Sequence, residues 1–206
     1  VYCLCMAKIA AAHRQPYRPL DFPGIGLMRE ILFLAHRVPW PPDRGDKIRS
    51  FHILKKLQSL APVHVGAFAD DARDVECAEA ERAGLASLHV EIRDKPSWFS
   101  GIEALASGKP VSLTSFGSKA MQDWVNERLA SGAISHIFVF SGQMAQYVPA
   151  DFDGLFIMDF VDVDSAKFES YAGEGNSLMR WVHAREGKKL ADFEAEIAQR
   201  ADASLF

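Results

Sequence analysis

A short basic loop at residues 36–46 carries the side chains best suited to binding an anion. It reads HRVPWPPDRGD and follows directly on an apolar run. Gly45 leaves the backbone bare beside a predicted helix N-terminus, where N–H groups and the helix dipole attract negative charge. Arg44 and Lys47 add positive charge, and His36 begins the loop. The loop therefore predicts a phosphate site around Gly45 and Arg44, although a proline-rich turn before a helix-capping acid would have the same composition.

Acidic and small residues follow two further apolar runs. Residues 158–168, MDFVDVDSAKF, carry Asp159, Asp162 and Asp164, whose carboxylates could accept hydrogen bonds from sugar hydroxyl groups, help to hold a metal, or act as a base. We take Asp162 as the candidate catalytic carboxylate, whereas Asp164 is equally suited to capping the next helix. Ser141 and Gly142 end another run, where small side chains either leave room for a ligand or form a turn.

Short apolar runs alternate with amphipathic stretches from residue 28 onward. This alternation predicts an α/β fold, a Rossmann-like open parallel sheet with helices on both faces. We expect Asp46 to cap the first helix, with Lys47, Lys55 and Lys56 facing water. Ligands bind outside the carboxyl ends of the strands in such sheets, so the residue groups above should meet at one edge. The predicted strands are 30–35, 63–68, 87–92, 136–141 and 155–160, with one more entered at 203–206, and further helices are predicted over 70–84, around 121–129 and around 178–197.

Composition narrows the classes of function. The formal net charge of −4 disfavours nucleic-acid binding. Three cysteines cannot form a disulfide framework and no ligand cluster has metal spacing, so we expect a cytoplasmic location and no metal. No window approaches the roughly 20 apolar residues of a membrane span. Residues 1–27 show no sustained period, so we expect an irregular extension upstream of a natural start at Met28, with 28–206 as the folded domain.

Three stretches together resemble a known family. They are ILFLAHRVPWPPDRGDKIRSFHILKKL, MDFVDVDSAKF and RWVHAREGKKLADFEAEIAQRADASLF. They look like the N-terminal half of GT-B glycosyltransferases of the family-4 type, closest to the sugar transferases of bacterial exopolysaccharide and PEP-CTERM exosortase gene clusters. The most specific motif is a strand followed by P-x-x-G-x-x-x-R before a helix. The resemblance covers the chain from residue 28 to its end.

The resemblance implies two Rossmann-like domains that face each other across a cleft, the first receiving the acceptor and the second holding most of the nucleotide-sugar. Gly45, Arg44 and Arg49 would then contact the donor diphosphate. Asp162 would lie near the acceptor-side catalytic region, where the family often has histidine. The other residues on the acceptor side would be His36, Ser141, Gly142 and Asp164.

The resemblance also implies the reaction. A sugar would pass from the nucleotide-sugar, a co-substrate rather than a bound cofactor, to a glycan or lipid-linked acceptor with retained anomeric configuration. Positioning and stabilisation of the leaving diphosphate would carry most of the catalysis. The family's second domain, with its basic pair and E-x(7)-E motif, does not follow Phe206, so we expect this chain to be inactive alone.

Two other classes of function stay open at this point. A non-catalytic α/β binding module would share the fold, although a receiver-like module needs an acidic pair where this chain has His36 and Arg37. Half of a sugar-nucleotide epimerase would share the two-domain plan, because fold does not fix function. In addition, Trp98, Phe99 and Ile102 lie in one segment that makes a peripheral membrane contact, touches the missing partner domain, or packs in the core.

Overall fold

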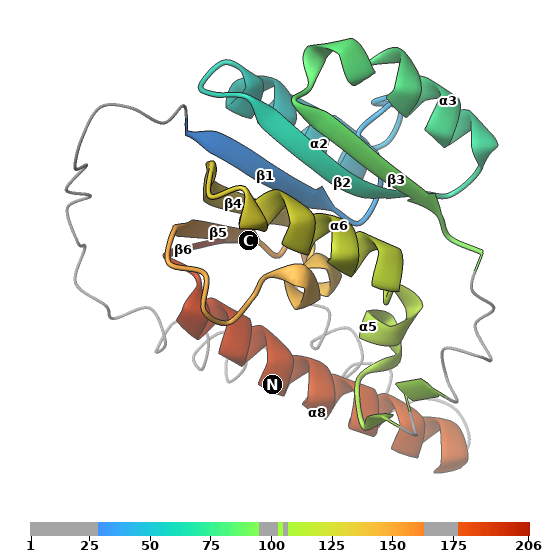
Figure 1. The fold of residues 1–206 in the computed structure, drawn as a ribbon. Helices are drawn as coiled ribbons and strands as arrows, with labels where there is room; N and C mark the ends of the chain where they lie inside the picture. The colour runs from blue at the N-terminus through green and yellow to red at the C-terminus, as the bar shows by residue number, and fades with distance from the viewer. Residues whose placement is uncertain (1–28, 95–102, 105–106, 163–176) are drawn as a thin grey trace.

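The computed structural model describes residues 29–94, 103–104, 107–162 and 177–206, which form an open sheet of six parallel strands (Figure 1). The strand order is β3-β2-β1-β4-β5-β6, so the order reverses between β1 and β4. This is the doubly wound Rossmann-like order, which confirms the predicted fold class. The strands are β1 (Glu30–Ala35), β2 (Val63–Ala69), β3 (Ser87–Ile92), β4 (Ile134–Phe140), β5 (Leu155–Asp159) and β6 (Ala203–Leu205).

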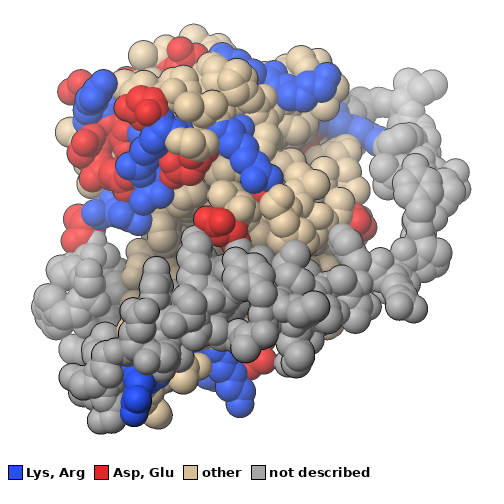
Figure 2. Space-filling view, turned by 180° about the vertical axis from the view of Figure 1, so that it is seen from behind, with Lys and Arg blue, Asp and Glu red and all other residues tan. Residues whose placement is uncertain are grey.

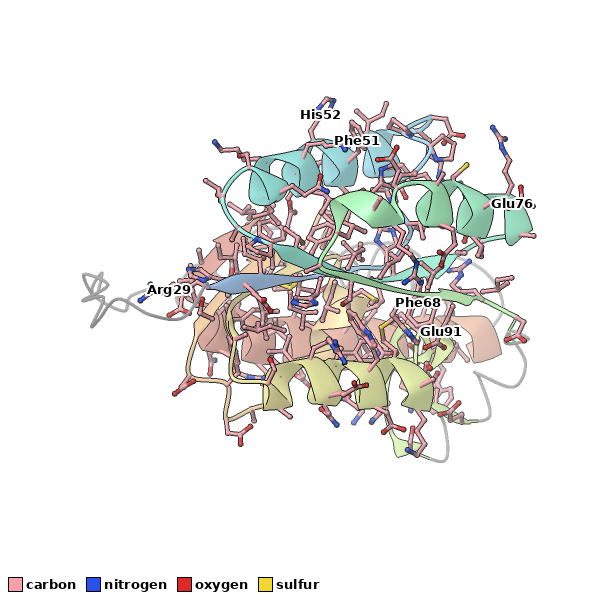
Figure 3. The ribbon with its side chains drawn as sticks, turned by 45° about the horizontal axis from the view of Figure 1, so that its top comes forward. Arg29, Phe51, His52, Phe68, Glu76 and Glu91 are labelled. Carbon is pink, nitrogen blue, oxygen red and sulfur yellow. The ribbon has the colours of Figure 1, made fainter. Side chains whose placement is uncertain are left out.

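Helices cover both faces of the sheet, as the alternating pattern predicted. Figures 1 and 3 show α2 and α3 on one face and α6 and α8 on the other. Right-handed crossovers require this division, because the chain moves outward from β1 in opposite directions in its two halves. The helices are α2 (Gly45–Gln58), α3 (Ala72–Ala80), α5 (Val111–Ser115), α6 (Lys119–Ala130) and α8 (Ser177–Arg200), with 3-10 turns η1 (Arg82–Gly84) and η2 (Gly142–Tyr147).

The central strands are buried on both faces, which explains why they read as nearly continuous apolar runs. All seven residues of β2 are buried, and in β1 only Glu30 is not. Leu32 and Leu34 pack into the cluster beneath α6 and α8, whereas Phe33 packs into the cluster beneath α2 and α3. The alternation of one strand between two cores fixes its register in the sheet.

The start of α2 differs from the prediction. The helix begins at Gly45 with Arg44 as its N-cap, and no side chain accepts a hydrogen bond there, so Asp46 is not the cap. Lys47 was expected to face water, yet it is 4% exposed and its Nζ lies 2.5 Å from a carboxylate oxygen of Asp74. A pairing with α3, on the far side of β2 in sequence, cannot be read from the periodicity of α2 alone.

Several predictions lie outside the described residues. These concern the extension before residue 28, the Trp98, Phe99 and Ile102 segment, and Asp164. Within the described part of the chain, no helix is both long and apolar enough to cross a membrane. Among the same residues, no group of three or more potential ligands could hold a metal ion.

Candidate functional site

The carboxyl ends of β1, β4 and β5 bring the predicted site residues to one edge of the sheet, at the reversal of strand order. The first loop leaves β1 there and leads into α2, while η2 and the chain after β5 leave the neighbouring strands. Open α/β sheets bind ligands at this crevice. The described residues placed along this edge are His36, Arg44, Gly45, Arg49, Ser141, Gly142 and Asp162.

An ionic network that we call the rim cluster joins three loops of this edge. Its members are Arg37, Arg44, Asp46, Asp70 and Arg93. The Arg37 guanidinium bridges both acids, donating from Nη1 to Asp46 and from Nε to Asp70, each at 2.9 Å. Arg44 repeats this bridge at 3.2 and 3.1 Å, and Arg93 lies 3.2 Å from the second oxygen of Asp70.

The rim cluster carries more positive than negative charge. Three guanidinium groups face two carboxylates, so one positive charge is left over within the cluster. Burial works to raise the pKa of Asp46 and of Asp70, but the arginines around them outweigh burial and hold both pKa values below the ordinary 3.8. Both acids are therefore ionised at neutral pH. Figure 2 shows basic and acidic side chains interleaved in one dense patch on the face seen from behind.

His36 is placed behind the rim cluster rather than on an open surface. It is 9% exposed, and its ring stacks on Phe140 at 5.9 Å and meets the edge of Phe116 at 6.2 Å between centroids. Its Nε2 lies 3.2 Å from Arg37 Nη1 and 3.5 Å from the Asp46 carboxylate. The histidine thus supports the network from within, and its aromatic packing positions the start of the loop.

Arg49 reaches from α2 across to the end of β5. Its Nη2 donates to Asp159 Oδ1 at 3.0 Å and lies 2.9 Å from Oδ2. The Asp159 side chain is fully buried, whereas that of Arg49 is 40% exposed. Asp159 Oδ1 also accepts the Val161 N–H at 3.0 Å. Asp159 was one of three candidate acids in the sequence, but the preferred one, Asp162, is exposed.

The chain is strained directly after β4 and directly after β5. Within the described residues, the non-glycine positions with positive φ are Ser141, at 82°, and Val161, at 66°. A β-branched residue is rare in this region, because its Cβ approaches the backbone. A tight turn holds Val161 there, with the Asp162 N–H donating to Phe160 O at 2.7 Å. Such strain clusters at functional sites, so these two neighbouring strand ends strengthen the case for this edge.

Two helices of the described chain, α3 and α6, begin with a side-chain cap, whereas α2 and the short α5 do not. Asp71 accepts the Asp74 N–H in α3, and Ser118 accepts the Met121 N–H in α6. In α2 the cap residue Arg44 provides no such bond. The first amides of α2 therefore lack a side-chain acceptor among the described residues, and the rim cluster, with its one surplus positive charge, adjoins this helix start through Arg44 and Asp46.

Gly45 stands in open space at this N-terminus. A Cβ built on it would meet nothing within 4 Å, and its φ is not in the left-handed region. Neither crowding nor backbone conformation in the described structure requires glycine at this position. Arg44 and Arg49, predicted together with Gly45, lie on the same stretch of chain but each is paired with acids.

Sequence reasoning named Asp159 among the acids of this edge but missed the other residues that organise it. Arg37, Asp70 and Arg93 come from the ends of three different strands, and Asp159 ends a fourth. Position at a strand's carboxyl end was the available signal, and only the paired geometry shows which of those residues meet.

Comparison with known proteins found no family model, no curated protein and no solved structure that matches this chain.

Proposed function

We propose that this chain is the acceptor-side domain of a retaining glycosyltransferase of the GT-B type. In this proposal it works in the cytoplasm and takes part in moving a sugar from a nucleotide-sugar to a glycan or lipid-linked acceptor in bacterial exopolysaccharide biosynthesis. Support comes from the P-x-x-G-x-x-x-R motif and from the place of that motif in the fold. The motif lies beside the reversal of strand order, where open α/β sheets bind ligands.

The bare, uncapped N-terminus of α2 is the observation on which the proposal depends. The fold gains nothing from glycine at position 45, since the space around it is open and its backbone is unstrained. A group arriving from outside the domain would explain its presence, because a diphosphate could approach the backbone amides without meeting a side chain.

The charged side chains would act by positioning. Arg49 is already held in place by its pair with the buried Asp159. Binding of a diphosphate would therefore cost this side chain little further rotamer entropy. Arg44 and the excess charge of the rim cluster would stabilise the leaving diphosphate. Asp162, exposed at the end of the strained turn, would accept hydrogen bonds from acceptor hydroxyl groups.

The test measures sugar transfer by the complete gene product that contains this chain. We expect nucleoside diphosphate to be released from a nucleotide-sugar only when an acceptor is present, with the product keeping the anomeric configuration of the donor. Gly45→Val should lower kcat/KM at least tenfold while leaving the melting temperature nearly unchanged. The valine fills space that the fold leaves open but that a diphosphate would need.

Lys56→Val is the matched control, because it places the same side chain on an exposed site in the last turn of the same helix. It should leave transfer unchanged. Full transfer by Gly45→Val would contradict the role given to the helix N-terminus. Conversion of the nucleotide-sugar without any acceptor would instead identify an epimerase, and absence of any turnover would favour a binding module.

A further inference from the structure

An apolar groove lies at the opposite edge of the sheet from the rim cluster. It encloses about 700 Å³ between the C-terminal end of α2 and the first residues of three strands, and it plays no part in the proposed transfer. Volumes of this size are typical of small-molecule sites. The groove is lined by Arg29, Ile31, Leu57, Leu60, Ala61, Pro62, His136, Ile137, Phe138, Leu155 and Ile157.

The strand register orders the floor of the groove. Ile31 of β1 is the partner of His136 in β4, which is in turn the partner of Leu155 in β5. Two residues further along, Phe138 pairs with Ile157 in the same way. The floor thus has one row that contains a polar ring at its middle and a second, deeper row that is wholly apolar.

The wall of the groove comes from the end of α2 and the chain that follows it. Leu57 is partly buried, and Leu60 is 65% exposed, the largest exposed fraction among the large apolar residues of the described chain. Leu60 thus exposes apolar surface to water beside an apolar floor. Covering this surface with an apolar ligand would be favourable, because it removes that surface from water.

The polar groups of the groove lie at its outer end. Figure 3 shows Arg29 at the very start of β1, beyond the edge of the sheet. Burial lowers the pKa of His136, and the positive charge of Arg29 lowers it further. His136 is therefore neutral at neutral pH, with its Nδ1 2.7 Å from Ser135 Oγ. Arg29 and His136 both line the groove, so the positive charge of Arg29 belongs to its outer end.

We propose that this groove binds a single-chain amphiphile with a carboxylate head group, such as a fatty acid. The carboxylate pairs with Arg29 at the outer end, and the chain lies over Phe138 and Ile157 against Leu57 and Leu60. One positive charge at one end of an otherwise apolar groove matches a ligand with one charge and one apolar chain. A nucleotide or free sugar would leave its many polar groups without partners there.

The experiment titrates the protein with dodecanoate below its micelle concentration and follows binding by calorimetry and by methyl NMR. We expect shifts at the methyl groups of Ile31, Leu57 and Ile157. Lengthening the chain from ten to twelve carbons should raise affinity about tenfold, because each buried CH₂ contributes favourably. Arg29→Gln should weaken dodecanoate binding about tenfold and leave dodecanol binding unchanged.

Leu60→Ser tests the wall, and Ile92→Ser is its matched control, since Ile92 is also an exposed large apolar residue but lies at the end of β3. Leu60→Ser should weaken both ligands, and Ile92→Ser neither. Failure of dodecanoate to shift the groove methyl groups would overturn the proposal. Equal binding of dodecanol and dodecanoate, unaffected by Arg29→Gln, would also overturn the proposal. That result would point to a protein partner for this face. Each result is independent of whether the transferase assay succeeds.

Discussion

At the scale of single residues, the pair formed by Arg49 and Asp159 is asymmetric, and this asymmetry predicts unequal effects of mutation. Asp159 is fully buried, whereas the Arg49 side chain is 40% exposed. Arg49→Ala would strand a buried carboxylate, which costs about 3 kcal/mol, near the low end for buried pairs because this one reaches solvent. Asp159→Asn would cost only about 1 kcal/mol, since the amide oxygen still accepts the Val161 N–H and Arg49 can turn to water.

Urea unfolding followed by circular dichroism measures both losses, with m-values compared to confirm that the transitions remain alike. Lys56→Ala serves as the control, because this exposed lysine lies on the same helix as Arg49 and should change the free energy of unfolding by less than about 0.5 kcal/mol. Equal losses for Arg49→Ala and Asp159→Asn would show that burial of the acid does not govern the pair.

At the scale of elements, strands were easier to predict than helix ends. The β1 and β2 runs are buried on both faces, so their sequences are nearly continuously apolar. The start of α2 depends instead on a cap and on a partner in α3. Lys47 reads as a solvent-facing lysine until Asp74 is seen beside it. Prediction of the candidate site met the same limit, because the role of Asp159 depends on its pairing with Arg49 on another element.

The contact between β2 and α6 leaves no room at Gly66. A Cβ there would lie 2.8 Å from Trp124 Cζ3, 2.9 Å from Leu34 Cδ2 and 3.0 Å from Met121 Sδ. Gly66→Ala should therefore lower the free energy of unfolding by about 1–3 kcal/mol through overpacking. The tryptophan ring is the least able to yield, because it is also stacked on His89 at 5.3 Å.

A double-mutant cycle with Trp124→Phe tests this explanation, since phenylalanine lacks the Cζ3 atom that a Cβ would meet. The cost of Gly66→Ala should fall by more than half when Phe occupies position 124. The same cost in both backgrounds would mean that the strand itself, rather than the packing of α6 against it, requires glycine.

At the scale of the whole molecule, the two edges of the sheet have opposite character. The carboxyl edge holds the rim cluster, which ties the ends of β1, β2 and β3 to the start of α2. The amino edge holds the apolar groove. Parallel strands make this separation possible, because every strand sends the same end to the same edge. Lowering the pH should therefore reduce the free energy of unfolding chiefly through the ion pairs of the carboxyl edge.

The pH dependence of unfolding tests that expectation through Asp70. Burial raises its pKa, but Arg37, Arg93 and Arg44 outweigh burial, so the folded pKa lies below 3.8. A lowered carboxyl pKa contributes stability above the ordinary value and loses it as pH falls through the folded value. The wild-type advantage over Asp70→Asn should thus be constant near neutral pH and shrink below pH 3.8. Asp123→Asn, at an exposed pair on α6, should show almost no such change, and an advantage of Asp70 that persists unchanged into acid would contradict the ionic account of this edge.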